Sequence, residues 1–121
     1  MPRILIVEDD HDLNDFVAIL LQGEGYEIAQ SFDGGDGVEK ARSFRPDLLV
    51  LDLMLPGLHG YQVARRLRAD PEFSKVKILV ASAKSFPADI QGAMDAGAND
   101  YLVKPYDAAT MRSRVASLLA A

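Results

Sequence analysis

Short runs of apolar residues alternate with stretches of helical periodicity along the whole chain. The apolar runs cover residues 4–7, 48–51, 78–80 and 101–103, and a weaker one covers residues 26–29. In the runs 4–7 and 78–80 every residue is apolar, with no polar residue in alternation. This continuity is typical of strands that are buried on both faces of a parallel sheet. The pattern therefore favours folds that are built around a central parallel sheet.

Each apolar run is followed by a stretch in which apolar residues recur at the spacing of a helix. In the first stretch, Leu13, Phe16 and Leu20 fall on one helix face. Four further stretches lie around residues 38–44, 63–67, 90–94 and 111–118. Five strand–helix units in succession predict an α/β fold, with a doubly wound parallel sheet and right-handed crossovers. We expect one domain that covers residues 1–121.

The composition excludes several classes of function. The chain has 13 basic and 18 acidic residues, for a net charge of −5, so we expect no direct binding of nucleic acid through the phosphate backbone. It has no cysteine, which excludes disulfides and thiolate metal sites and fits a cytoplasmic location. No apolar run approaches the length that spans a bilayer, so we expect no membrane insertion.

Acidic residues stand where two of the predicted strands end. Asp9 and Asp10 follow the first strand, and Asp52 ends the third. These two strands are neighbours in the strand order that is usual for such sheets, so we expect the three carboxylates to share one pocket. A hard cation such as Mg²⁺ relieves the repulsion between clustered carboxylates, and it prefers oxygen ligands. A single aspartate is more often a helix N-cap, which is how we interpret Asp12 and Asp107.

Two other strand ends carry groups that suit a phosphoryl group. The fourth strand ends at Ser82, and the fifth ends at Lys104, which precedes Pro105. A hydroxyl, an ammonium and a metal ion at one edge of a sheet could together bind the three oxygens of a phosphoryl group, as phosphoryl transfer requires. The Lys104–Pro105 bond is interpreted as a cis peptide that fixes the approach of the lysine.

These motifs together resemble the response-regulator receiver domains of two-component signalling. The resemblance rests on VEDD at 7–10, LVLDLMLPGLHG at 49–60, LVASA at 79–83 and GANDYLVKPY at 97–106. It covers nearly the whole chain, and it is specific because the four motifs occur in this order. It implies a flavodoxin-like fold with five parallel strands in the order 2-1-3-4-5 and helices on both faces.

The resemblance also implies the chemistry of the site. Asp52 would accept a phosphoryl group from a histidine kinase or a phosphotransfer protein. Asp10 and Asp52 would ligate Mg²⁺ and would therefore have to lie close enough to share one ion. Asp9 would act largely through water, and the backbone carbonyl of Met54 would complete the protein ligands.

The same resemblance implies a signalling switch rather than an enzyme with a separate substrate. Lys104 would pair with the phosphoryl oxygens, Ser82 would move toward the phosphate, and Tyr101 would follow that movement. The change would reach a downstream partner, or a fused output domain, through the face between the fourth and fifth helices. On that face Asp100 and Arg114 are charged, whereas uncharged Gln91 and Thr110 stand where charges would be expected, so the dimer familiar from related receivers is not predicted.

Two alternatives stay open beside this interpretation. A small Mg²⁺-dependent phosphohydrolase with the same aspartyl chemistry would need a general acid–base two residues after Asp52, where this chain has Met54. A receiver-like module that is never phosphorylated would not need the full set of acids, hydroxyl and lysine. The resemblance to receivers implies that Met54 and Lys84 hold positions that border the attacking water. Methionine orients water poorly, so we predict slow hydrolysis of the acyl phosphate.

Overall fold

The computed structural model describes residues 1–121 and is built on one five-stranded parallel sheet. The strands are β1 (Arg3–Val7), β2 (Glu27–Ser31), β3 (Leu48–Leu51), β4 (Lys77–Ser82) and β5 (Asp100–Val103). Their order in the sheet is β2-β1-β3-β4-β5, and all four pairings are parallel. The predicted fold class and strand order are confirmed.

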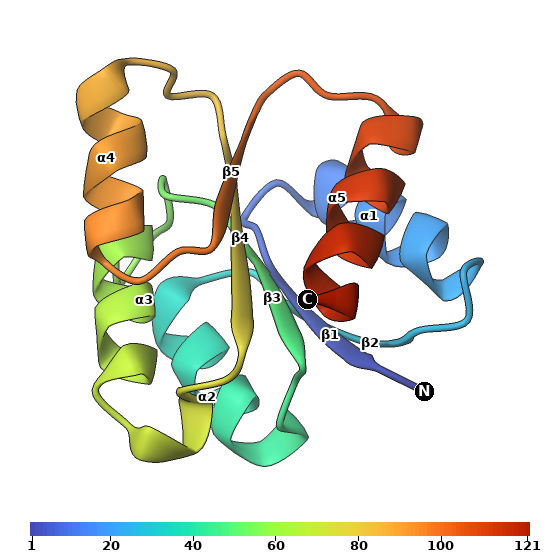
Figure 1. Ribbon diagram of the computed structural model, residues 1–121, viewed down its shortest axis with the longest axis horizontal. Helices are drawn as coiled ribbons and strands as arrows, with labels where there is room; N and C mark the ends of the chain where they lie inside the picture. The colour runs from blue at the N-terminus through green and yellow to red at the C-terminus, as the bar shows by residue number, and fades with distance from the viewer.

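Helices follow each strand and cover both faces of the sheet. They are α1 (His11–Gln22), α2 (Gly34–Phe44), α3 (Gly60–Arg68), α4 (Pro87–Asp95) and α5 (Ala108–Ala120), with a short 3₁₀ helix, η1 (Pro71–Phe73), before β4. Helices α1 and α5 lie on one face, and α2, α3 and α4 lie on the other (Figure 1). None of the helices combines the length and the hydrophobicity that a membrane span requires.

The two faces of the sheet contribute to two separate apolar cores. Along β1, Ile4 and Ile6 pack with α1 and α5, whereas Leu5 and Val7 pack with α2, α3 and α4. Successive side chains of a strand point to opposite faces, so a strand that is covered on both faces needs an apolar residue at every position. This arrangement explains the continuous apolar runs in the sequence.

Side-chain caps define where several helices begin. Asp107 caps α5 as predicted, by accepting a hydrogen bond from the N–H of Thr110 (2.7 Å). Helix α1 begins two residues earlier than predicted, because its cap is Asp10 and Asp12 lies within the first turn. The interpretation of Asp12 as the N-cap was therefore wrong.

Candidate functional site

The candidate site lies at the carboxyl edge of the sheet, where hydrogen bonds between neighbouring strands continue past the strand ends. The N–H of Asp52, directly after β3, donates to the carbonyl of Val7 in β1 (3.0 Å). In the same way the N–H of Lys104, directly after β5, donates to the carbonyl of Ser82 in β4 (2.8 Å). The parallel register thus brings residues that are far apart in the sequence to one edge.

Three carboxylates gather at this edge. An oxygen from each of Glu8, Asp9 and Asp52 lies within 4.8 Å of the other two. Glu8 and Asp52 are buried, each with 6% of its surface exposed, while Asp9 is exposed to solvent. Hard oxygen donors with one solvent-facing member fit Mg²⁺, which usually takes one or two carboxylates and keeps several waters. These three residues could hold the ion.

Lys104 joins the two buried carboxylates. Its Nζ donates to Oδ2 of Asp52 (2.8 Å) and to Oε1 of Glu8. Burial alone would lower the pKa of Lys104, but the hydrogen bonds to Asp52 and Glu8 outweigh it and raise the pKa above its ordinary value. The lysine is therefore held as an ammonium that offsets part of the negative charge.

Glu8 has the opposite balance of effects. Burial raises the pKa of Glu8 to about 7, against the hydrogen bond from Lys104 that favours its ionised form. The nearby charge of Asp52 adds to the rise. One shared ammonium does not compensate two buried carboxylates and a third beside them, so the cluster still lacks positive charge. A divalent cation would supply it.

Both carboxylate oxygens of Asp52 accept a hydrogen bond. Oδ1 accepts a hydrogen bond from the backbone N–H of Met54 (3.1 Å), and Oδ2 accepts the bond from Lys104. The start of α3 packs closely against this residue, since a Cβ added at Gly60 would lie 2.4 Å from the carbonyl oxygen of Asp52. Only glycine fits there, so the start of α3 can lie directly against the backbone of Asp52.

Ser82 and Tyr101 lie beside the site without joining the carboxylate cluster. Ser82 is fully buried, and its Oγ accepts a hydrogen bond from the N–H of Lys84 (3.3 Å). The hydroxyl of Tyr101 donates to the carbonyl oxygen of the same Lys84 (2.7 Å). Both side chains therefore contact the loop between β4 and α4, which connects the site to the α4 surface.

The structure places Asp10 outside the carboxylate cluster. Its Oδ1 accepts a hydrogen bond from the N–H of Leu13 (3.1 Å) as the cap of α1, and it is not a member of the carboxylate cluster. Glu8, which the sequence interpretation did not choose, takes that place. The spacing of a helix cap, with Asp10 three residues before Leu13, was the signal that could have separated the two acids.

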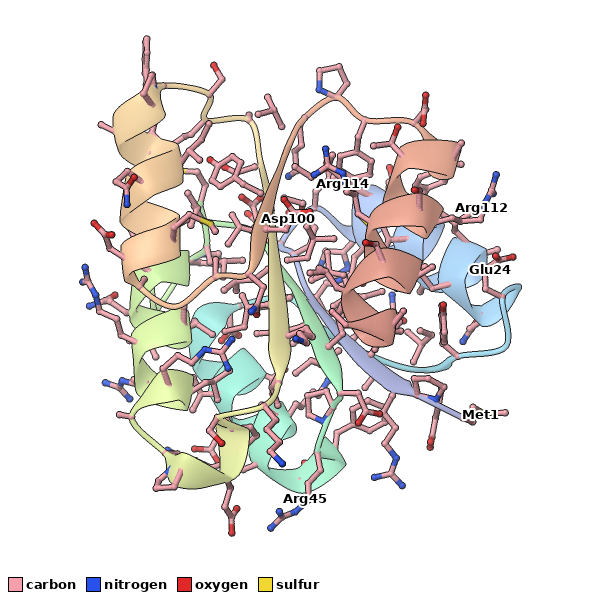
Figure 2. The ribbon with its side chains drawn as sticks, in the orientation of Figure 1. Met1, Glu24, Arg45, Asp100, Arg112 and Arg114 are labelled. Atoms are coloured by element: carbon pink, nitrogen blue, oxygen red, sulfur yellow. The ribbon has the colours of Figure 1, made fainter.

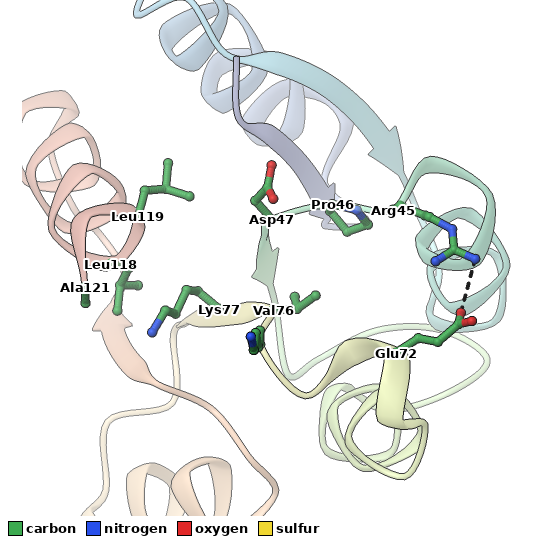
Figure 3. Close-up of a pocket in the computed structure, with 10 residues that line it drawn as sticks. Arg45, Pro46, Asp47, Glu72, Val76, Lys77, Leu118, Leu119 and Ala121 are labelled. Carbon is green, nitrogen blue, oxygen red and sulfur yellow. Dashed lines mark ion pairs between the residues drawn. The ribbon is translucent and has the colours of Figure 1, made fainter.

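Two pockets differ in their relation to the site. One of about 380 Å³ borders it and is lined by Leu13, Ala83, Lys104, Pro105 and Tyr106, and the Lys104–Pro105 bond is cis as predicted. The other, of about 350 Å³, lies at the amino ends of β3 and β4 beside the end of α5, and Figure 3 shows the ion pair of Arg45 and Glu72 at its rim (3.2 Å). It contains none of the clustered carboxylates and lies outside the site.

A doubly wound parallel sheet with acids, a hydroxyl and a lysine at its carboxyl edge defines the class of this protein. A family model described as "Response regulator receiver domain" matches residues 4–116, and the chain belongs to this family. The resemblance that the sequence motifs indicated is thereby confirmed.

Relatives with known names agree with this assignment. The chain is 45% identical over 120 residues to the DNA-binding dual master transcriptional regulator RpaA of Synechocystis, covering 98% of this chain and 49% of that protein. It is 42% identical over 117 residues to the DNA-binding response regulator MtrA of Mycobacterium tuberculosis, covering 97% of this chain and 50% of that protein. The chain thus spans about half the length of the curated relatives it matches.

Solved structures share the fold across nearly their whole length. A putative response regulator from Chloroflexus aurantiacus superposes with a TM-score of 0.93 at 32% identity, covering 99% of this chain and 98% of that one. The receiver domain of the sensor histidine kinase PA1611 from Pseudomonas aeruginosa superposes with a TM-score of 0.91 at 30% identity, with the same coverage. That crystal structure has a magnesium ion coordinated in the active site cleft.

Proposed function

We propose that this receiver domain accepts a phosphoryl group on Asp52 and thereby changes its affinity for a partner. The observation that supports the choice of Asp52 is its environment. It is the buried carboxylate that Lys104 and the Met54 N–H hold from two sides, next to the carboxylates of Glu8 and Asp9. A fixed nucleophile beside a cation site is what phosphoryl transfer needs.

The donor would be a phosphohistidine of a histidine kinase or a phosphotransfer protein. A carboxylate oxygen of Asp52 attacks the phosphorus, the P–N bond of the phosphohistidine breaks, and the imidazole nitrogen leaves with the bonding electron pair. The product is an acyl phosphate on Asp52, a covalent form that aspartate is known to take. The domain would catalyse only this step and the later loss of its own phosphoryl group.

Mg²⁺ would be held by Glu8, Asp9 and Asp52, with the backbone carbonyl of Met54 as a further ligand. When bound, it supplies positive charge to the carboxylates and to the phosphoryl oxygens. Lys104 adds the second positive charge and would pair with a phosphoryl oxygen in place of its present bond to Asp52. These roles assign Asp10 to the helix cap and Glu8 to the metal site.

The switch would start with the hydroxyl of Ser82. A phosphoryl group carries about −1.5 to −2 charge and strong acceptor oxygens, so it would draw the buried hydroxyl toward it. The N–H of Lys84 bonds to Ser82 and the carbonyl of Lys84 bonds to Tyr101, so movement of Ser82 would disturb both contacts. A modification can shift a conformational equilibrium only through such differential contacts.

We infer that the output passes through the face of α4, β5 and α5 to a downstream partner or a fused output domain. On this face Arg114 of α5 pairs with Asp100 of β5 within the chain (3.0 Å; Figure 2). RpaA and MtrA are named DNA-binding, but this chain spans only half of each, and its net charge is −5. We therefore assign no nucleic-acid contact to these residues, and a cytoplasmic location stays a prediction.

Phosphorylation by a small phosphodonor tests the proposal. We expect intact-mass spectrometry to show one added phosphoryl group on the wild-type protein with acetyl phosphate and Mg²⁺, and none when the metal is chelated. The Asp52→Asn variant should show no addition, while the matched variant Asp12→Asn, on the first turn of α1, should behave as the wild type. Equal phosphorylation of Asp52→Asn would contradict the assignment.

A further inference from the structure

We infer that Asn14 is a positioning residue for the metal site, holding the peptide group between Glu8 and Asp9 in the orientation that presents both carboxylates to the ion. This inference rests on the proposed function, since it assumes that Mg²⁺ binds at these residues. Asn14 lies near the start of α1, and its side chain bonds to the backbone of Glu8 rather than to a carboxylate of the cluster.

Asn14 is fully buried, with 0% of its surface exposed, and both the nitrogen and the oxygen of its amide are hydrogen-bonded. Its Nδ2 donates to two backbone carbonyls, those of Glu8 (3.0 Å) and Ser31 (2.9 Å). Its Oδ1 accepts a hydrogen bond from Nε2 of Gln30 (2.9 Å). Burying an amide without hydrogen bonds costs free energy, and these three bonds offset that cost for Asn14.

The hydrogen bonds around Asn14 and Gln30 determine which way the oxygen and the nitrogen of each side-chain amide point. Nε2 of Gln30 also donates to the carboxylate of Asp15 (2.8 Å), which only accepts, so the nitrogen of Gln30 must lie on that side. Oδ1 of Asn14 must then face Gln30, and its nitrogen must face the two carbonyls. The orientation of Asn14 therefore follows from its neighbours.

These bonds hold the backbone of Glu8 on both sides. The N–H of Glu8 donates to the carbonyl of Ser31 (3.1 Å), and the carbonyl of Glu8 accepts from Asn14. Because each peptide group is planar, fixing these two groups fixes the backbone dihedrals of Glu8. The second group also connects to Cα of Asp9, so the directions in which both acidic side chains leave the backbone depend on Asn14.

Positioning of this kind matters because the cluster is repulsive without its cation. Three carboxylates with oxygens within 4.8 Å would separate if the backbone allowed it. Side chains behind the ligands of metal sites hold them in place, and their loss typically lowers metal affinity by about 10- to 100-fold. Asn14 thus lowers the reorganisation that Mg²⁺ binding requires.

The test compares Mg²⁺ affinity with stability in two variants. Asn14→Leu keeps a similar volume and removes both donors, and we expect its dissociation constant for Mg²⁺ to rise about tenfold, measured by NMR titration of the Asp9 amide. Ser31→Ala is the matched control, because it removes a buried hydroxyl that bonds to Asp36 and leaves the Ser31 carbonyl that accepts from Asn14. It should lower the melting temperature while keeping Mg²⁺ affinity close to that of the wild type.

Wild-type affinity in Asn14→Leu would overturn the inference, and so would an equal loss of affinity in both variants. If the wild-type protein bound no Mg²⁺, the proposed function itself would fail, and the two failures are thus distinguishable. Should Asn14→Leu not fold, the wild-type protein still gives an answer. We expect an NMR scalar coupling across the hydrogen bond from Asn14 Nδ2 to the Glu8 carbonyl in the Mg²⁺-bound form, and its absence there would overturn the inference.

Discussion

The charge at the site is balanced between one ammonium, that of Lys104, and the buried carboxylates of Glu8 and Asp52. Glu8 and Asp52 are buried, and both lie against the one ammonium of Lys104. Burial favours the neutral form of a carboxyl group, while a nearby ammonium favours the ionised form. For Glu8 the first effect wins, and its pKa is raised to about 7. Without a metal ion the site therefore resists the ionisation of this residue.

Stability should consequently depend on pH through Glu8. A carboxyl group with a raised pKa in the folded state contributes stability that is fully present below its unfolded pKa, 4.5, and is lost as the pH rises through about 7. In the presence of a chelator, we expect the wild-type free energy of unfolding to fall over this range relative to Glu8→Gln. At pH values above about 7 the variant should be more stable by on the order of 1 kcal/mol.

Urea unfolding across the pH range measures this difference. The control is Glu24→Gln, a change at an exposed residue in the turn after α1, which should keep the wild-type pH dependence. A wild-type curve that runs parallel to that of Glu8→Gln would show that Glu8 does not titrate as described.

Met54 carries a prediction about the lifetime of the phosphorylated form. Met54 is 52% exposed two residues after Asp52, and a thioether cannot hold water by a strong hydrogen bond. We expect the acyl phosphate to decay several-fold faster in Met54→Asn, because the amide can orient the attacking water. Loss of the phosphoryl group over time, followed by intact mass, measures the rate. An unchanged or slower decay in the variant would refute this role.

Among the helices, α4 has the weakest attachment at its beginning. Its N-cap residue is Phe86, which is 75% exposed and makes no side-chain cap, and Ala93 is its only buried residue. The hydroxyl of Tyr61 in α3 donates to the carbonyl of Asp89 in the first turn of α4 (2.9 Å). Segments with few buried contacts open at low free energy. The hydrogen bond from Tyr61 to Asp89 should therefore contribute much of the free energy that keeps α4 closed.

Tyr61→Phe tests the attachment of α4. The variant keeps the ring and loses the hydroxyl, and we expect amides in α4 to lose about 1 kcal/mol of protection in hydrogen exchange, the typical value of one hydrogen bond. Amides in α2 should keep their protection. The control Tyr26→Phe, before β2, should leave α4 as it is in the wild type. Equal protection of α4 in all three proteins would contradict the role of Tyr61.

Strands and helices were largely predictable because their signals are local. The runs at 48–51 and 78–80 are apolar throughout, since the strands they form are covered on both faces. Asp52, Ser82 and Lys104 could be placed at one edge because each stands at the end of such a run. Choosing the metal ligand between Glu8 and Asp10 required knowing where α1 begins. Near a helix start, an acidic residue can serve either as the N-cap or as a metal ligand, and the sequence alone did not separate the two roles.

Asn14 could not be identified from the sequence at all. Its partners are carbonyl groups of the backbone, one of them on β2, and the sequence does not reveal which carbonyls a buried amide meets. The same holds for Tyr61 in α3. Its acceptor is the carbonyl of Asp89 in α4, and strand β4 lies between these two helices in the sequence. Contacts between side chains and distant backbone require the folded structure.

The whole molecule has one apolar core on each face of the sheet, and the candidate site lies at the carboxyl edge of the sheet. The acids that follow β1 and β3 lie near the middle of the sheet, and the neighbouring strands β4 and β5 supply Ser82, Tyr101 and, directly after β5, Lys104. Phosphorylation at the edge would therefore reach the surface of α4 through Ser82, Lys84 and Tyr101. This route is the core of the proposed switch.

Beryllofluoride, a mimic of the phosphoryl group, tests the switch most directly when it is added with and without Mg²⁺ and the NMR resonances of Tyr101 are followed. We predict a shift of these resonances that requires Mg²⁺, that is lost in Asp52→Asn, and that persists in Asp12→Asn. No Mg²⁺-dependent shift in the wild-type protein, or the same shift in Asp52→Asn, would contradict the account.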